Sequence, residues 1–415
     1  MRPRIGIDVC PIRRMEIAVA RSGERFLRRA FTPAELAYCD GRAERLAGRW
    51  AAKEAVIKCL DWTGDRPHRR QVEVLATESG APRVTLQGPA DRWDVDVTIS
   101  HDGGLAAAAA VVGERRETLL PPPAAVVVPD RPPEGHKGTF GSVCAIAGSY
   151  GLTGAAFLCA TAAARIGAGT VRLHVAQTIY PILAVKCTEV MASPTDEVAP
   201  GVLGDTAAAT LSQQLRQARA GLIGPGLGQD GRTQALVGTL VAEAGAKLVI
   251  DADGLNALAA DRTRLRGLRQ EHVLTPHPGE MGRLLAQPTG EVQRARAEVA
   301  RRAASEWGAV VVLKGAHTLV AAPDGRLSED PHAVPALGTG GTGDVLAGVV
   351  AGLLAQGLPA YEAAVTGVFL HAAAGRRLAA RQGTLLASDL LREAPVVAEE
   401  LRQQRAAARS PGGTC

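Results

Sequence analysis

Hydrophobic and polar positions follow two different patterns along the chain, and the pattern changes near residue 114. Before that point, apolar runs and alternating positions predict short strands at 4–9, 71–75, 83–86, 95–100 and 105–112. A long helix is predicted over 42–60. The first part of the chain is therefore expected to form a small α+β unit.

A helix start is visible at residues 31–35. Thr32 can cap the helix, Pro33 suits its first position, and Glu35 completes a capping box. The sequence therefore predicts a second helix that begins at Pro33.

After residue 114 the pattern becomes strand, glycine-rich loop and helix, repeated several times. Buried strands are predicted at 143–147, 220–223, 248–250 and 310–313, each followed by a loop: GSYGLTG, GPGLGQD, DADGLN and KGAHT. Strands that alternate with helices indicate an α/β domain with a mostly parallel central sheet flanked by helices. Ligands of such sheets bind outside the carboxyl ends of the strands, where these loops fall.

Proline density marks the boundary between the two patterns. Six prolines lie within residues 114–135 and favour extended, non-helical backbone. We therefore expect one domain over 1–113, a proline-rich linker or lead-in over 114–135, a second domain over 136–400 and a disordered tail over 401–415.

Composition and charge exclude several classes of protein. Hydrophobic residues make up 46% of the chain and charged residues 21%, as in an ordinary globular protein. Aromatic residues make up 3%, too few for the stacking platforms that bind single-stranded nucleic acid. The net charge is +5, and the first 58 residues are the skewed part, with 13 basic against 7 acidic residues. This bias favours an acidic partner or phosphates, or else marks a solvated helix face.

Cysteine spacing and apolar run lengths bear on localisation. Seven cysteines without a CxxC pair indicate neither a disulfide framework nor a zinc site. Asp8 interrupts the N-terminal apolar run, which lacks the core of a signal peptide. The longest apolar runs fall short of the roughly 18 residues needed to span a bilayer. We expect a cytoplasmic protein whose partners are neither nucleic acid nor membrane.

Chemistry-bearing residues of the first unit lie at a predicted strand end and on the long helix. Asp8 ends the first strand, while Glu54 and Lys58 are four residues apart and share a helical face. Two such carboxylates can hold Mg²⁺, which fills its other positions with water and substrate phosphates, and Lys58 can pair with the same phosphates. The spacing equally allows an ordinary ion pair between Glu54 and Lys58.

The ordered strings IGID, FT…EL, RWAAKEA…K and ISHD resemble holo-acyl-carrier-protein synthases, the small trimeric class of 4′-phosphopantetheinyl transferases, over residues 3–113. The resemblance implies that fold and a Mg²⁺-dependent transfer of phosphopantetheine from coenzyme A to a serine of acyl carrier protein, as in fatty acid biosynthesis. The resemblance implies that Asp8 and Glu54 would be catalytic metal ligands and that Lys58 would be a phosphate contact. His101, with Asp102, would belong to the edge of the active site.

Acyl carrier protein is acidic, so basic residues near the N-terminus become candidate docking residues: Arg14, Arg21, Arg25 and Arg28. Residues 60–70 depart from the glycine-rich stretch that is usual after KEAxxK in this family. The alternative for this unit is a noncatalytic carrier-binding or oligomerisation module.

The string GTGGTGD at 338–344 places glycines before an apolar helix, with Asp344 in its first turn. Backbone N–H groups at such a helix start form an anion site. A carboxylate there can act as a base on a hydroxyl that receives a phosphoryl group. The same pattern is also typical of a purely structural helix start.

Further strings occur in the order seen in NAD(P)H-hydrate dehydratases of the ribokinase-like superfamily, which the chain resembles over 119–395: HKGTFG, AGS…GAA, GAG, TEVM, GPGLG, DADGLN, TPHPGE, KGAHT and GTGGTGD. The resemblance implies a lyase for metabolite repair. It would restore hydrated NADH or NADPH at the expense of ADP or ATP, by phosphorylating the ring hydroxyl and then losing phosphate.

Site residues follow from the same resemblance. Asp344 would be the base and a hydrate contact, with Ala155, Gly226 and His277 around the damaged dinucleotide. The adenine nucleotide would be held by Lys314, Gly315, Ala316, His317, Thr318 and Gly343. Residues 331–337 lack the Gly-Asn-Pro-Gly that often precedes GTGGTGD.

Two questions stay open at the level of the sequence. A ribokinase-like small-molecule kinase is the alternative for the second domain. We expect a homo-oligomer, but the first family typically forms trimers and the second tetramers.

Overall fold

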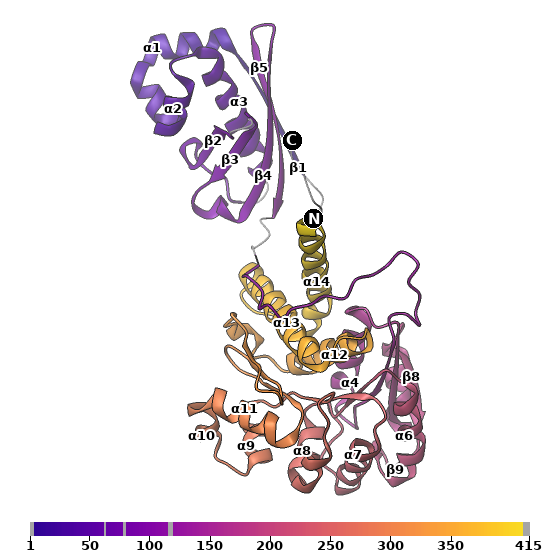
Figure 1. Cartoon of the computed structure of the whole chain (residues 1–415). Helices are drawn as coiled ribbons and strands as arrows, with labels where there is room; N and C mark the ends of the chain where they lie inside the picture. The colour runs from indigo at the N-terminus through magenta and orange to yellow at the C-terminus, as the bar shows by residue number, and fades with distance from the viewer. Residues whose placement is uncertain (1–3, 62–63, 78–79, 115–118, 410–415) are drawn as a thin grey trace. The chain divides into compact units, whose positions relative to one another are not determined.

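The computed structural model describes residues 4–61, 64–77, 80–114 and 119–409, and the chain divides into two compact units, Met1–Thr118 and Leu119–Cys415 (Figure 1). Each unit has its own hydrophobic core. Among the described residues, no helix combines the length and the apolar run that a membrane crossing requires.

Unit 1 is an α+β domain, as the sequence predicts. Its helices are α1 (Ile12–Ala30), α2 (Pro33–Cys39) and α3 (Ala43–Leu60), with short 3-10 turns η2 (Arg69–Gln71) and η3 (Gly88–Arg92). Its strands are β1 (Arg4–Pro11), β2 (Val72–Ala76), β3 (Pro82–Leu86), β4 (Trp93–Asp102) and β5 (Leu105–Glu114). Strands β1, β5 and β4 form an antiparallel sheet in that order, and β2 and β3 form a separate hairpin.

Helix α3 packs closely on the inner face of the three-stranded sheet. A Cβ on Gly6 of β1 would lie 2.0 Å from the carbonyl oxygen of Ala55, so only glycine permits this approach. The predicted capping box at α2 is confirmed, because Thr32 Oγ1 accepts from Glu35 N–H and Glu35 Oε2 accepts from Thr32 N–H.

A buried ion pair joins three elements of unit 1. Lys53 of α3 and Glu35 of α2 have no exposed side-chain surface, and their charged atoms are 2.7 Å apart. Lys53 Nζ also donates to the carbonyl oxygens of Arg69 and Val72, while Glu35 Oε1 accepts from Val74 N–H of β2. These bonds satisfy the polar atoms of the pair, so the arrangement fixes α2, α3 and β2 together.

Unit 2 is an α/β domain with a nine-stranded sheet, in the order β16-β15-β14-β13-β12-β11-β6-β7-β8. Its strands are β6 (Ser142–Ile146), β7 (Thr170–Ala176), β8 (Met191–Thr195), β9 (Glu197–Ala199), β10 (Val202–Leu203), β11 (Ala220–Ile223), β12 (Lys247–Ile250), β13 (Val273–Leu274), β14 (Val310–Leu313), β15 (Leu319–Ala321) and β16 (Leu327–Glu329). Seven strands from β14 to β8 are parallel, and β15 and β16 are antiparallel. The predicted mostly parallel sheet is confirmed.

Helices cover both faces of this sheet. They are α4 (Thr153–Arg165), α5 (Tyr180–Lys186), α6 (Ala208–Gln217), α7 (Gly231–Glu243), α8 (Asp253–Ala260), α9 (Pro278–Leu285), α10 (Thr289–Arg294), α11 (Arg296–Trp307), α12 (Thr342–Ala355), α13 (Ala360–Gln382) and α14 (Ala387–Arg409). The 3-10 turns are η4 (Gln177–Ile179), η5 (Asp205–Ala207), η6 (Arg262–Gly267) and η7 (Pro335–Leu337). Helices α4, α12, α13 and α14 lie on one side of the sheet, and α6 to α11 lie on the other (Figure 1).

Residues 119–135, within the proline-rich segment, belong to unit 2 and pack against its core. Val128 is buried in its core, and Thr366 Oγ1 of α13 accepts from Val127 N–H at 2.9 Å.

The expected disordered tail over 401–415 needs correction, because α14 continues to Arg409. Its residue Arg402 donates to the carbonyl oxygen of Pro129, which ties the end of the helix to the packed segment. Residues 410–415 lie outside the described part of the chain.

Candidate functional sites

Strand order in unit 2 brings four loops to one edge of the sheet, three of them predicted glycine loops and the fourth the loop with the string TPHPGE. Strands β11, β12, β13 and β14 are parallel neighbours, so their carboxyl ends meet. The loops that follow them begin at Gly224, Asp251, Thr275 and Lys314. Residues far apart in the sequence are thereby placed around one site.

The start of α12 is fixed by bonds around Thr342. Gly341 caps the helix with φ +90°, a conformation that favours glycine, and a side chain there would meet Leu158. Thr342 Oγ1 donates to the carbonyl oxygen of Leu337 at 2.8 Å, and His371 Nε2–H donates to the carbonyl oxygen of Thr342 at 2.9 Å. Burial lowers the pKa of His371 to about 4, so this histidine is neutral.

Asp344 lies in the first turn of α12, where the predicted base is expected. Burial raises the pKa of Asp344, and the carboxylate of Asp251 raises it further, to about 7, against the opposing effect of Lys314. A carboxylate with such a pKa can accept a proton from a bound hydroxyl near neutral pH. Its raised pKa therefore suits Asp344 to the role of a general base.

Lys314 joins the start of α12 to the neighbouring strands. Its Nζ lies 2.7 Å from Asp251 Oδ1, 3.7 Å from Glu280 Oε2 and 3.4 Å from the position of a Cβ on Gly343. Burial alone would lower the pKa of Lys314, but the Asp251 and Glu280 carboxylates outweigh it and raise the pKa, so the ammonium stays charged. Thr275 Oγ1 donates to the same Asp251 oxygen at 2.8 Å.

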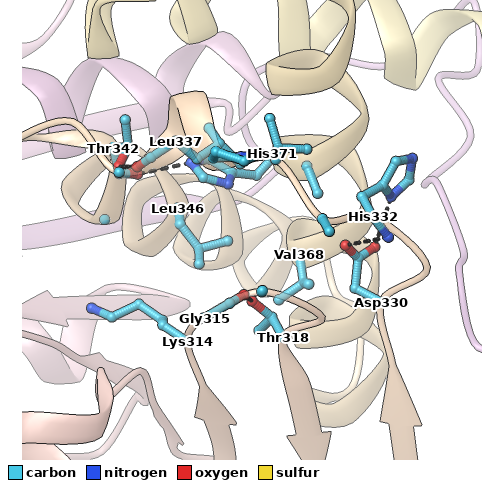
Figure 2. A pocket seen from close by; sticks show the side chains of 17 residues that line it. Lys314, Gly315, Thr318, Asp330, His332, Leu337, Thr342, Leu346, Val368 and His371 are labelled. Carbon is cyan, nitrogen blue, oxygen red and sulfur yellow. Dashed lines mark hydrogen bonds and ion pairs between the residues drawn. The ribbon is translucent and has the colours of Figure 1, made fainter. Parts of the chain in front are cut away.

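A cavity of about 440 Å³ opens beside Lys314 (Figure 2). Of the predicted nucleotide contacts, Lys314, Gly315, Ala316, Thr318 and Gly343 line it. Its apolar wall includes Val334, Leu337, Leu346 and Val368. His317 is not among the lining residues, and its Nδ1 lies 3.1 Å from the carbonyl oxygen of Asp330.

The remaining predicted residues lie in the first turn of α4 (Ala155), in the loop after β11 (Gly226) and at the start of α9 (His277). The Ala155 Cβ is 2.9 Å from the position that a Cβ on Gly226 would take. His277 caps α9, and its Nδ1 accepts from the N–H groups of Gly279 and Glu280 at 3.0 and 3.3 Å. Burial lowers the pKa of His277, so its ring is neutral at pH 7 and carries its proton on Nε2.

Sequence reasoning assigned no role to Asp251 or Glu280, although both occur in motifs it used. Asp251 follows β12 directly, so its position at a strand end is a signal that could have found it. Glu280 Oε2 accepts from the backbone N–H of His277 at 2.8 Å, and Oε1 is 3.5 Å from His277 Nε2. It therefore lies between His277 and Lys314.

In unit 1, the structure brings Asp8 and Lys58 together. Lys58 Nζ is 2.8 Å from Asp8 Oδ1 and also donates to the carbonyl oxygen of Ile7 at 3.1 Å. Glu54 pairs with Arg69, whose Nε is 2.5 Å from Oε1, instead of forming the i,i+4 pair with Lys58 that the spacing also allowed. Arg69 lies in the segment 60–70 that departs from the family pattern.

His101 lies at the other end of α3 from Lys58. A Cβ on Gly48 would lie 2.6 Å from His101 Nε2, so the imidazole ring covers the start of the helix. Asp102 follows at the exposed end of β4. Within the chain, His101 is therefore placed near Gly48, whereas Asp8 is placed beside Lys58.

Comparison with known proteins agrees with the division into two units. Residues 143–396 match the family model described as NAD(P)H-hydrate dehydratase, and residues 4–111 match that of the 4′-phosphopantetheinyl transferase superfamily. Among solved structures, a ribokinase-like superfamily protein from Enterococcus faecalis is 28% identical, with a TM-score of 0.58, over 66% of this chain and 92% of its own. The fold and site of unit 2 therefore define a protein of the ribokinase-like class.

Two further relatives indicate which family within this class the chain belongs to. An ADP-dependent (S)-NAD(P)H-hydrate dehydratase from Xanthomonas campestris is 39% identical over 274 residues, which are 65% of this chain and 92% of the relative. A Bacillus subtilis ADP/ATP-dependent NAD(P)H-hydrate dehydratase, co-crystallised with ATP and Mg²⁺, is 30% identical with a TM-score of 0.54, over 66% of this chain and 94% of its own. The chain belongs to the NAD(P)H-hydrate dehydratase family.

A third relative shows how the chain differs in organisation. The bifunctional NAD(P)H-hydrate repair enzyme Nnr of Moorella thermoacetica is 44% identical over 279 residues, 67% of this chain. The match covers 53% of that relative, so the chain spans about half the length of such curated relatives. The predicted fusion of the two families in one polypeptide is confirmed by the two family models.

Proposed function

We propose that unit 2 dehydrates hydrated NADH or NADPH at the expense of ADP, with ATP as the alternative phosphoryl donor. The single observation that carries this proposal is Asp344, a half-buried carboxylate with a pKa near 7 in the first turn of α12, next to the charged Lys314. Family membership and the dehydratase relatives support it.

The proposed chemistry follows from this arrangement. The ring hydroxyl of the hydrate loses its proton to Asp344 while its oxygen attacks the terminal phosphorus of the nucleotide. The bridging P–O bond of the nucleotide breaks, and AMP leaves when ADP is the donor, or ADP when ATP is the donor. Lys314 and the N–H groups at the start of α12 stabilise charge on the transferred phosphoryl group. Phosphate then leaves the ring carbon, the neighbouring carbon loses a proton, and the double bond of the dihydronicotinamide is restored.

Substrate binding is assigned to two sides of this centre. The cavity beside Lys314 takes the adenine nucleotide, whose base fits against the apolar wall. Ala155, Gly226 and His277 contact the damaged dinucleotide on the other side of Asp344. Mixing the chain with ADP and hydrated NADH and following absorbance at 340 nm tests the proposal. No recovery with ADP or ATP would favour the ribokinase-like kinase alternative.

We propose that unit 1 transfers phosphopantetheine from coenzyme A to a serine of acyl carrier protein. Asp8 and Glu54 offer carboxylate oxygens of the kind that Mg²⁺ takes. Their cationic partners, Lys58 and Arg69, are 54% and 43% exposed and can turn away. The donor set therefore fits the ion, which when bound would neutralise charge on the pyrophosphate. Lys58 would bind the phosphates, and a carboxylate would remove the serine proton, directly or through water.

The alternative for unit 1 is a noncatalytic module, and mass spectrometry distinguishes the two. Apo-carrier protein incubated with coenzyme A, Mg²⁺ and the chain gains the mass of phosphopantetheine if unit 1 is a transferase. The Asp8→Ala variant should not produce this gain. No gain with the wild-type chain would support the module.

Docking of acyl carrier protein is assigned to α1. Arg14, Arg21, Arg25 and Arg28 are exposed on it, although Gly23 interrupts the helix with non-helical backbone. Charge reversal at Arg21 and Arg25 should weaken use of the carrier protein and leave coenzyme A binding intact. Unchanged kinetics would remove this assignment.

We also propose a cytoplasmic homo-oligomer built in part by unit 1. The outer face of its sheet is apolar, because Ile5 pairs with Val111 and Ile7 with Ala109 in register, and Ile5 and Ile7 are 67% and 60% exposed. A second copy of the chain is the proposed cover for this face. Ile7→Asp should lower the molar mass measured by light scattering; an unchanged mass would contradict a role for this face.

A further inference from the structure

An arginine with unused hydrogen-bond donors lies on α9, close to the proposed dinucleotide contacts. Arg283 is exposed, and its Nε donates to Asn256 Oδ1 at 2.9 Å. Within the described part of the chain, its two Nη nitrogens have no hydrogen-bond or ion-pair partner. The guanidinium is therefore held at Nε, and both Nη nitrogens remain available to a ligand.

Its position is next to His277. Arg283 Nη1 is 3.9 Å from the position that a Cβ on Gly279 would take, and His277 Cε1 is 2.8 Å from the same position. The positive charge of Arg283 also contributes to the lowered pKa of His277. Arg283 and His277 thus share one rim of the site.

A chain of hydrogen bonds ties the same arginine to the loop after β11. Asn256 Nδ2 donates to Asp253 Oδ1 at 3.1 Å, and Asp253 Oδ2 accepts from Gly228 N–H at 2.9 Å. Gly228 is two residues beyond Gly226, another proposed dinucleotide contact. The guanidinium is therefore anchored to both sides of the proposed dinucleotide subsite.

Charge also favours an anion at this point. A hydrated NADH carries two phosphate groups, and a hydrated NADPH carries three. These groups would enter a region that already contains the carboxylates of Asp251, Asp253 and Glu280. Lys314 is committed to Asp251 and Glu280 by its ion pairs. The free Nη groups of Arg283 can bind phosphate oxygens in a fork.

We propose that Arg283 binds a phosphate group of the dinucleotide substrate, with Asn256 holding its guanidinium in place. The assignment rests on the proposed function of unit 2 and adds a specificity-determining contact to it. The phosphate is either part of the pyrophosphate, common to both dinucleotides, or the 2′-phosphate, which NADPH alone carries.

Equilibrium binding of the products NADH and NADPH to the full chain tests this assignment without relying on catalysis. Nucleotide fluorescence should show that Arg283→Gln weakens binding by about tenfold, and Arg283→Lys by less, because the charge remains but the fork is lost. If Arg283→Gln loses affinity equally for NADH and NADPH, the contact is with the pyrophosphate. If it loses affinity for NADPH alone, the contact is with the 2′-phosphate.

Arg266→Gln is the matched control. Arg266 is exposed on η6, which precedes β13, whereas His277 follows that strand, so the same charge is removed at the opposite edge of the sheet. Binding by this variant should equal that of the wild-type chain. Kinetics provide a second readout: in Arg283→Gln, KM for the hydrate should rise about tenfold with kcat preserved.

Two results would overturn the assignment. One is equal binding of both dinucleotides by wild type and Arg283→Gln, and the other is no binding by the wild-type chain. If the wild-type chain binds NADPH but does not restore hydrated NADPH, the proposed dehydratase function fails, while weaker binding by Arg283→Gln still supports the phosphate contact.

Discussion

At the scale of single residues, the chemistry of unit 2 depends on an aspartate held in an unfavourable environment. Burial and the Asp251 carboxylate make ionisation of Asp344 costly, and Lys314 offsets only part of that cost. An aspartate in water is a weak base at neutral pH, whereas one with a pKa near 7 accepts protons readily. The environment that makes Asp344 a useful base should therefore also destabilise the fold.

The pH dependence of dehydration should follow the ionisation of Asp344. The basic form of Asp344 is the ionised one, so kcat/KM for the hydrate should rise with pH and level off above about 7. Asp251→Asn removes a negative neighbour and should move the midpoint to lower pH. An unchanged midpoint in that variant would show that another group is titrating.

Stability should change in the opposite direction to activity. Because the folded pKa of Asp344 is raised from 3.8 to about 7, stability is lost as pH rises between these values, by at most about 4 kcal/mol. Asp344→Asn should therefore be inactive and have a higher Tm than wild type at pH 8, with a smaller gain at pH 5. Calorimetry at both pH values measures this; a variant no more stable than wild type at pH 8 would contradict the account.

At the scale of elements, glycine loops after parallel strands shape the proposed dinucleotide subsite. Gly226 and Gly228 both have positive φ, of +64° and +80°, so alanine is strained at either position. Their surroundings differ. A Cβ on Gly226 would lie 2.9 Å from Ala155 Cβ and from the carbonyl oxygen of Leu152, whereas one on Gly228 would have its nearest neighbour at 3.5 Å.

This difference provides a matched pair of variants. Gly226→Ala should weaken NADH binding at least about tenfold more than Gly228→Ala, because it adds a clash inside the loop to the shared backbone strain. Nucleotide fluorescence titration measures both. Equal effects would mean that backbone strain alone matters and that Gly226 does not line the subsite.

The elements of unit 1 are joined by the buried pair of Lys53 and Glu35. Lys53→Met should destabilise unit 1 by about 3 kcal/mol, because it leaves a buried carboxylate without its cation. Lys58→Met removes a half-exposed partner and should cost less than about 1 kcal/mol. Hydrogen exchange of α2, α3 and β2 compares the two; similar protection in both variants would show that the buried pair contributes little.

At the scale of the whole molecule, two separate cores support two proposed sites in one chain. Local patterns in the sequence predicted the strands of unit 1, the capping box, and strands β6, β11, β12 and β14 of unit 2 with the glycine loops that follow them, because each depends on neighbouring residues. The pairs Lys53–Glu35, Glu54–Arg69 and Lys314–Asp251 were not predicted. They join residues 18, 15 and 63 positions apart, so they depend on how elements pack.

The two proposed activities should be separable within the full chain. Asp8→Ala should abolish phosphopantetheine transfer and preserve dehydration, and Asp344→Asn should do the reverse, because each residue lies in a different unit. Mass spectrometry of the carrier protein and absorbance at 340 nm measure the two activities on the same preparations. Loss of both activities in either variant would contradict independent sites.

Repair of hydrated dinucleotide by unit 2 can be followed in a single assay. Hydrated NADH, ADP and the full chain are mixed, and absorbance at 340 nm is followed beside the Asp344→Asn variant. The wild-type chain should restore absorbance in proportion to the ADP consumed, and the variant should not. No recovery by wild type with ADP or ATP, or equal recovery by the variant, would contradict the proposed repair.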